Sequence, residues 1–149
     1  MEILDVNILV YAFRDEMTQH TPMAAYLNAL VNDDRAFGVP EVVLSALVRI
    51  VTQKPWNPPS PPAKVLDFCS ALRSAPNCLV VQPRDSHWGV FDYLCRATGA
   101  RGKRVADAYL AAYALDRGDE WVTTDADFHR FPGLRWRNLL TGQSGTNPR

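Results

Sequence analysis

Apolar side chains occur along this chain as short clusters separated by longer runs with helical spacing. The short clusters predict strands, and they cover residues 2–4, 36–40, 78–82, 120–124 and 134–136. The longer runs predict helices, and they cover residues 6–13, 21–33, 41–51, 62–75, 85–99 and 104–118. Residues 6–13 also suit a strand, and a helix after the first strand is favoured. The alternation predicts an α/β fold with three layers, in which helices cover both faces of a mainly parallel sheet of four to five short strands.

Proline and glycine mark several boundaries between these elements. Pro22 and Pro62 stand where a helix begins, and Gly99 and Gly118 stand where one ends. Five prolines within residues 54–62 exclude regular structure there, and residues 125–131 predict a turn or a short helix. We therefore expect one domain over residues 1–140, followed by a mobile tail over residues 141–149.

Composition narrows the class of protein without naming a partner. The 149 residues fit one domain, and 16 basic and 16 acidic side chains cancel. The three cysteines form no CxxC pair, so neither a disulfide framework nor a zinc knuckle is indicated. No apolar run is long enough for a membrane span, and no secretory signal is present at the N-terminus. These features predict a cytoplasmic protein that does not contact a membrane.

Acidic residues follow three of the predicted strands. Asp5, Glu41 and Asp125 come directly after strands, and Asp107 lies in the first turns of the helix over residues 104–118. Each one alone is equally well explained as a helix cap, a turn residue or a favourable charge at a helix N-terminus. Because the carboxyl ends of parallel strands meet at one edge, all four could converge there.

Carboxylates brought together in this way repel one another unless a cation neutralises them. Mg²⁺ and Mn²⁺ prefer oxygen ligands and commonly bind between protein carboxylates and phosphates. Such an ion can activate a water molecule for attack on a phosphodiester, so no protein nucleophile is required. The histidines, which show no mutual metal-binding spacing and suit surface or capping roles better, are His20, His87 and His129.

A basic segment precedes the helix that carries Asp107. Arg101, Lys103 and Arg104 lie in and after a glycine-containing loop, which is either a solvated surface or a grip on nucleic-acid phosphates. Three further arginines are candidates to extend that surface: Arg130, Arg135 and Arg137. Beside an acidic metal site, the phosphate-binding interpretation predicts contact with RNA or DNA backbone.

Three motifs together resemble the PIN-domain family, and most closely its VapC-type ribonuclease toxins. LDVNILVYAF resembles the opening strand with the metal-binding aspartate, here Asp5, and a polar residue at Asn7. VADAYLAAYAL resembles the helix that carries the central acid, here Asp107. WVTTDADFHRFPGL resembles the closing TxDxDF motif, with Thr123, Asp125 and Asp127 near the site. The resemblance covers residues 1–140 and implies a PIN-like α/β/α fold, with Asp5, Asp107 and Asp125 as metal ligands and Asn7, Thr123 and Asp127 in support.

The chain departs from the family pattern at one acid. The family usually has a glutamate in a stretch like AELLR, and the matching stretch here is SALVR, with Ala46 at the position of the glutamate. Glu41 lies five residues earlier and is the candidate to replace it as a fourth catalytic carboxylate.

The resemblance also implies a function and partners. It implies an endoribonuclease dependent on Mg²⁺ or Mn²⁺ that cleaves RNA such as transfer or ribosomal RNA, with Arg101, Lys103 and Arg104 at the RNA. It further implies a homodimer and a cognate antitoxin that inhibits it, as in type II toxin–antitoxin pairs.

Two other functions remain open at this point. A haloacid dehalogenase-type phosphatase also begins with an aspartate after a strand, but its motif requires a second aspartate where Asn7 stands. A non-catalytic PIN-like module that binds RNA or protein is the stronger alternative, because the family glutamate is missing at Ala46.

Overall fold

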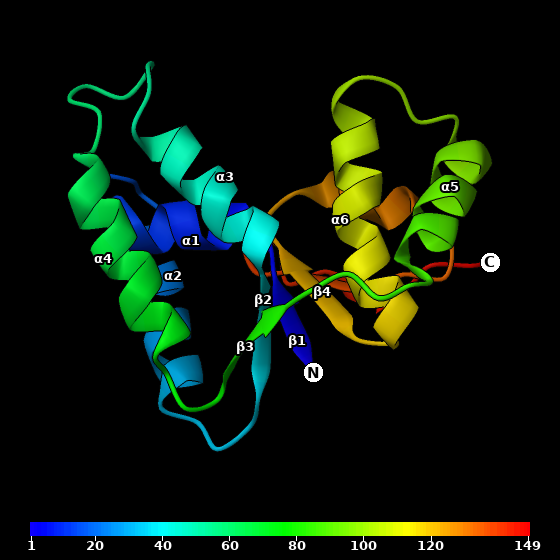
Figure 1. Ribbon diagram of the computed structural model, residues 1–149, viewed down its shortest axis with the longest axis horizontal. Helices are drawn as coiled ribbons and strands as arrows, with labels where there is room; N and C mark the ends of the chain where they lie inside the picture. The colour runs from blue at the N-terminus through cyan, green and yellow to red at the C-terminus, as the bar shows by residue number, and fades with distance from the viewer.

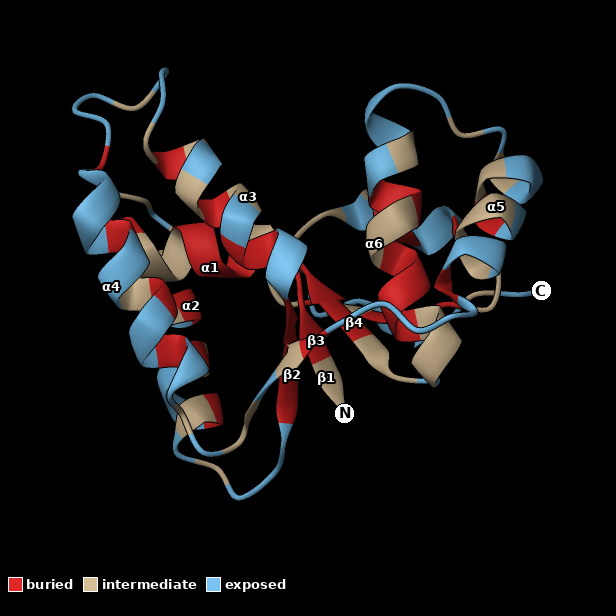
Figure 2. Ribbon diagram, viewed as in Figure 1, coloured by how far each residue is buried: buried red, intermediate tan, exposed pale blue.

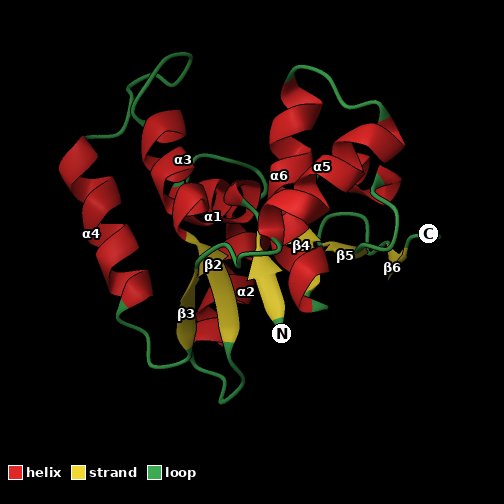
Figure 3. Cartoon of the chain, turned by 45° about the vertical axis from the view of Figure 1, so that its right-hand side comes forward, coloured by secondary structure: helices red, strands yellow, loops and turns green.

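A six-stranded sheet separates two layers of helices in the computed structural model, which describes residues 1–149 (Figure 1). The strand order is β3-β2-β1-β4-β5-β6, and all neighbours are parallel except β5 and β6. Figure 3 shows this order. The strands are Glu2–Leu4 (β1), Phe37–Pro40 (β2), Cys78–Val81 (β3), Glu120–Thr123 (β4), Arg135–Asn138 (β5) and Ser144–Thr146 (β6). The predicted α/β fold is confirmed, with six strands instead of four to five.

The helices divide into two groups by side of the sheet. Figure 1 shows α1 to α4 on one side and α5 and α6 on the other. The helices are Val6–Phe13 (α1), His20–Val31 (α2), Glu41–Val51 (α3), Pro62–Arg73 (α4), His87–Thr98 (α5) and Lys103–Arg117 (α6), with a short 3₁₀ helix at Ala126–Arg130 (η1). Gly99 and Gly118 end α5 and α6 with positive φ angles of 61° and 68°, as expected of glycine C-caps. None of these helices is long and apolar enough to cross a membrane.

The core lies between the sheet and the inner faces of the helices, where Figure 2 shows most of the buried residues. Phe37 and Trp121 are fully buried on β2 and β4. On α6, Ala108, Ala111 and Ala112 are also fully buried. Because these alanines are small, α6 can pack closely on β4 and bring its first turns to the edge of the sheet.

The sixth strand comes from the tail. Residues 144–146 form β6 against β5, and Asn147 donates hydrogen bonds to the carbonyls of Phe128 and Phe131 at 3.0 and 2.8 Å. The indole of Trp136 donates to the same asparagine at 2.9 Å. The prediction of a mobile tail omitted this strand, because the side chains of Ser144–Thr146 are exposed and carry no hydrophobic pattern.

The topology determines which elements reach the carboxyl edge of the sheet, meaning the edge where the parallel strands end. β1 and β4 are neighbours, with Leu4 opposite Val122, so Asp5 and Thr123 follow at the same level. α6 ends at Arg117 and β4 begins at Glu120, so the helix runs back against the strand. The first turns of α6, with Asp107, therefore lie at this carboxyl edge.

Candidate active site

Asp5 is held rigidly where β1 ends and α1 begins. Its backbone N–H donates to the carbonyl of Val122 at 2.9 Å, which extends the pairing of β1 with β4 by one residue. One carboxylate oxygen accepts the Val6 N–H at 2.7 Å, and the other accepts the Thr123 hydroxyl at 2.6 Å. Only 3% of Asp5 is exposed. The carboxylate is thus a buried helix cap and, at the same time, a group aimed at the carboxyl edge.

Asn7 and Thr123 connect Asp5 to the loop after β4. The Asn7 amide donates to Asp5 at 3.0 Å and to the Thr123 hydroxyl at 3.1 Å. Its carbonyl oxygen accepts the Thr124 N–H at 3.1 Å, and the Thr123 hydroxyl accepts the Asp125 N–H at 3.0 Å. The structure therefore brings together two of the three residues that the motifs predicted as supporting groups, and they form a hydrogen-bonded frame between two acids.

Asp107 and Asp125 complete an acidic cavity of about 440 Å³. Asp107 is 8% exposed, and its carboxylate accepts no hydrogen bond in the structure. Asp125 caps η1 by accepting the Asp127 N–H at 2.9 Å, and its other oxygen lies 3.4 Å from the ammonium of Lys103. The residues that line the cavity are Asp5, Val6, Asn7, Tyr11, Lys103, Asp107, Leu110, Thr124, Asp125, Ala126 and Phe128.

Burial and repulsion from neighbouring acids raise the pKa values of Asp5 and Asp107. Burial raises the pKa of Asp5 to about 6. The negative charges of Asp107 and Asp125 also raise this pKa, whereas the hydrogen bonds from Thr123 and Val6 lower it. Burial also raises the pKa of Asp107, which Lys103 opposes. Additional positive charge in the cavity would relieve both effects.

The donor set suits a divalent cation in chemistry, although no three acidic, histidine or cysteine side chains form a ready-made cage. The carboxylates of Asp5, Asp107 and Asp125 are oxygen donors of the kind that Mg²⁺ and Mn²⁺ take. Two of them are buried beside each other, and neither has a cationic partner within ion-pair distance. The residues present therefore fit a hard cation that would draw them closer.

The predicted basic and supporting residues lie at different distances from the cavity. Lys103 lines it, whereas Arg101 and Arg104 are exposed at the start of α6 and make no ion pair. Asp127 pairs with Arg130 at 2.8 Å and does not line the cavity. Of these three basic residues, only Lys103 is therefore a part of the cavity, and the two arginines are exposed, unpaired cations next to it in the chain.

Glu41 is not brought to this site. It is exposed at the first position of α3, where it accepts hydrogen bonds from Arg73 at 3.0 Å and Gln82 at 2.9 Å. These bonds lower the pKa of its carboxyl group. Positions 41 and 46 differ by about 140° around a helix and by about 7.5 Å along it, so a carboxylate at one cannot reach the place served by the other. The expectation that Glu41 replaces the missing family acid is wrong in this geometry.

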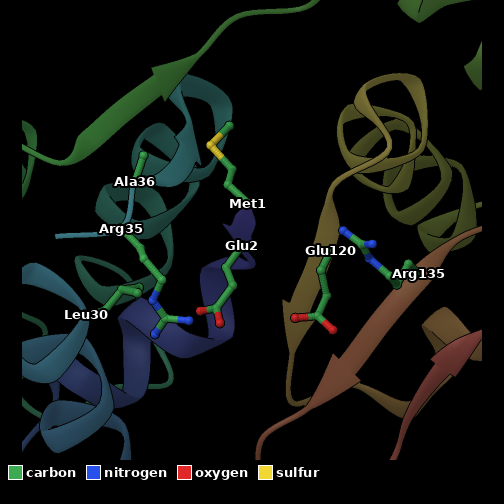
Figure 4. A pocket seen from close by; sticks show the side chains of 7 residues that line it. All are labelled: Met1, Glu2, Leu30, Arg35, Ala36, Glu120 and Arg135. Atoms are coloured by element: carbon green, nitrogen blue, oxygen red, sulfur yellow. The ribbon is translucent and has the colours of Figure 1, made fainter. Parts of the chain in front are cut away.

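A second cavity, lined by two glutamates and two arginines, lies at the opposite, amino edge of the sheet, where the parallel strands begin (Figure 4). Its volume is about 330 Å³, and Glu2 and Glu120 are among its lining residues. Both glutamates pair with Arg137, at 2.6 and 3.3 Å. Glu2 also accepts the hydroxyl of Tyr26. Arg137 lies opposite Val122 in β5, but these ion pairs turn its guanidinium back to the amino edge and away from the active-site cavity, so the suggestion that it extends the basic surface of the active site is wrong.

Two features of the site region were missed in the sequence. Tyr11 lines the cavity from α1, one turn after Asn7, and the spacing of four residues could have revealed it. We expected a surface or capping role for His87, but it is only 3% exposed. Its ring packs against those of Tyr109 and Tyr113, with ring centroids 4.6 and 4.4 Å apart. Neither ring nitrogen of His87 has a partner, and no local pattern signals its burial.

The comparisons with known proteins agree with this architecture. A PIN domain family model matches residues 3–134. Ribonuclease VapC43 of Mycobacterium tuberculosis is 39% identical over 145 residues, covering 97% of this chain and 99% of the relative. Ribonuclease VapC31 of the same species is 32% identical over 136 residues, covering 91% and 96%.

Solved structures show the same fold. VapBC2 of Rickettsia felis, bound to a promoter DNA fragment, superposes with a TM-score of 0.68 at 19% identity, covering 92% of this chain and 97% of that one. VapBC-1 of nontypeable Haemophilus influenzae superposes with a TM-score of 0.67 at 16% identity, covering 94% and 98%. The chain belongs to the PIN-domain family. Within it, the chain is a VapC-type member, as the motifs predicted, and both of these relatives are named ribonucleases.

Proposed function

We propose that this VapC-type protein hydrolyses RNA phosphodiesters with one or two divalent cations, Mg²⁺ or Mn²⁺, held by Asp5, Asp107 and Asp125. The observation that carries the proposal is the buried carboxylate of Asp107, which has neither a hydrogen bond nor an ion pair although it lies beside two other acids. An unpaired buried charge of this kind destabilises the folded protein, and a bound cation offsets that destabilisation. The cation, when bound, supplies an activated water and charge stabilisation at the phosphate.

The chain's own residues have distinct roles in this proposal. Thr123 and Asn7 hold the Asp5 carboxylate in one orientation, so this ligand is fixed before a cation arrives. No serine, cysteine or histidine lines the cavity, so water is the nucleophile. Lys103 at the cavity, with the exposed Arg101 and Arg104 next to it in the chain, would bind RNA phosphates near the scissile bond. Structured RNA, such as transfer or ribosomal RNA, is the proposed substrate class.

A cognate antitoxin and a second copy of the chain are the proposed protein partners. An apolar groove of about 310 Å³ between α1, α2 and α4 suits an antitoxin helix, and the solved relatives are VapBC complexes. It is lined by Ala12, Ala24, Leu27, Asn28, Val31, Phe68, Ala71 and Leu72. On α5, the side chains of Trp88 and Tyr93 are 70% and 47% exposed, and such aromatic exposure suits a homodimer contact.

A non-catalytic module that binds RNA or protein is the second candidate. Ala46 leaves the site without the family's fourth acid, and the remaining carboxylates do not converge as they stand. Metal binding without RNA cleavage would favour this function over the enzyme.

Substitution of Asp107 by asparagine tests the proposed enzyme. Cleavage of total RNA in Mn²⁺ should fall at least about 100-fold, because the substitution removes a metal-binding charge without changing the side-chain shape. Asp67 on α4 is exposed and unpaired, so Asp67→Asn is the matched control and should cleave at the wild-type rate. EDTA should abolish wild-type cleavage. Full cleavage by Asp107→Asn, or cleavage that persists in EDTA, would contradict the proposal.

A further inference from the structure

Lys103 occupies an unusual position at the mouth of the acidic cavity. It is the first residue of α6, it lines the cavity, and its ammonium lies 3.4 Å from a carboxylate oxygen of Asp125. The charges of Asp125 and then Asp107 raise the pKa of the Lys103 amine. Lys103 is therefore the one cation that the chain itself supplies to the acids proposed to bind metal.

The start of α6 is an unfavourable place for this lysine on local grounds. The N-terminal end of a helix carries partial positive charge, which favours acids and disfavours lysine in the first turn. The first turn of α6 has no acidic residue, and Lys103 and Arg104 are its first two residues. Arg104 makes no ion pair, whereas Lys103 turns inward to Asp125. Attraction from the acidic cavity, and not the helix, thus accounts for the orientation of Lys103.

The ion pair between Lys103 and Asp125 is also easily broken. The side chain of Lys103 is 77% exposed, that of Asp125 is 28% exposed, and the separation is at the long end for a direct contact. Exposed pairs of this type contribute little to stability, since water competes for both partners. A divalent ion carries twice the charge of an ammonium and can bind several carboxylates at once. Such an ion can therefore displace Lys103 without disturbing the fold.

We propose that Lys103 is an internal counter-cation of the acidic site, which occupies Asp125 in the metal-free protein and competes with the divalent ion for it. The inference rests on the proposed metal-dependent function and adds a residue that sets the metal affinity. When the metal binds, Lys103 leaves Asp125 and its ammonium becomes available to an RNA phosphate. Metal affinity is thereby lower than the three carboxylates alone would produce.

Calorimetric titration of Mn²⁺ into the purified full-length protein tests this role. Lys103→Met should bind Mn²⁺ about three- to tenfold more tightly than wild type, because a nearby positive charge is removed. Lys103→Arg keeps the charge and should bind within about twofold of wild type. Lys64→Met on α4 removes another exposed lysine, outside the cavity, and should leave the affinity unchanged.

The outcomes separate this inference from the function on which it rests. Wild-type binding with unchanged or weaker affinity in Lys103→Met would overturn the counter-cation role and leave the metal site standing. No wild-type binding at millimolar Mn²⁺ would overturn both. Thermal unfolding provides a second readout: at one Mn²⁺ concentration, the rise in Tm above the EDTA value should be larger for Lys103→Met than for Lys64→Met. Equal rises would count against the proposal.

Discussion

The two edges of the sheet both carry clustered acidic residues, but the charges are balanced at only one of them. At the amino edge, the carboxylates of Glu2 and Glu120 share the guanidinium of Arg137, and Tyr26 donates a further bond. At the carboxyl edge, Asp107 has no partner, and an exposed lysine 3.4 Å from Asp125 is the only cation within ion-pair distance of the cavity acids. The difference teaches that acidic clustering alone does not identify a site, whereas clustering without compensation does.

The balance of charge follows from the kind of residue that each edge places beside its acids. On β5, Arg137 lies opposite Val122, two residues after Glu120 on β4, and its side chain reaches back to both glutamates at the amino edge. At the carboxyl edge, the groups beside Asp5 are hydrogen-bond donors without charge, namely Thr123 and Asn7. Hydrogen bonds orient a carboxylate but leave its negative charge in place, which is the state that a metal ligand requires.

The largest expected difference between the edges is the pH dependence of the metal-free protein. The pKa of Asp5 is about 6 in the folded state and 3.8 for an ordinary aspartate, so the folded state binds more protons between these values. Stability from this group is therefore present below pH 3.8 and lost as the pH rises to 6. Relative to Asp5→Asn, the free energy of unfolding of wild type should fall by about 3 kcal/mol between pH 3.5 and pH 7.

Urea denaturation in EDTA at several pH values measures this difference. Asp67→Asn should follow wild type across the range, because its carboxylate is exposed and unpaired. Saturating Mn²⁺ should flatten the dependence above pH 6, since a bound cation favours the ionised form of Asp5. A wild-type stability that rises relative to Asp5→Asn with increasing pH would show that the carboxyl edge is compensated like the amino edge.

Removal of the amino-edge cation should have the next largest effect. Arg137→Met leaves two partly buried glutamates without their shared partner and should lower the free energy of unfolding by about 2 kcal/mol at pH 7. The neighbouring Arg135 is exposed and donates only to the carbonyl of Gly118, so Arg135→Met should change stability by less than about 0.5 kcal/mol. RNA cleavage per folded molecule should be unchanged in Arg137→Met. A loss of cleavage without a loss of stability would mean that Arg137 belongs to the active site after all.

The fold was predictable wherever burial leaves a hydrophobic pattern. The helix over residues 41–51 has the predicted bounds, and the first five strands differ from expectation by at most a few residues. β6 was not predictable in this way, because its three residues are exposed and its position depends on backbone pairing with β5 and on Asn147. A strand that is held by hydrogen bonds to a distant segment has no local signature.

The site was predictable wherever a residue's place follows from chain order. Asp5 and Asn7 follow β1, and Thr123 ends the neighbouring parallel strand β4, so their proximity could be expected, and the structure brings them within hydrogen-bond distance. The inward turn of Lys103 and the burial of His87 depend on which side chains of other elements lie opposite. Helical periodicity assigns a face but does not identify the partner on that face.

Substitution of Glu41 should have the smallest effect on cleavage and stability among the acids considered. Glu41 directly follows a strand, as a site residue is expected to do, but it does not lie at the site. Its carboxylate is 55% exposed and is bound by Arg73 and Gln82, away from the cavity. Glu41→Gln keeps the shape and should retain RNA cleavage within about twofold, with a stability change below about 0.5 kcal/mol because exposed ion pairs contribute little. Cleavage assays in Mn²⁺ beside Asp107→Asn provide the scale. A loss of cleavage as large as that of Asp107→Asn would mean that Glu41 reaches the metal when RNA is bound, and that the carboxyl edge recruits an acid which is compensated in the free protein.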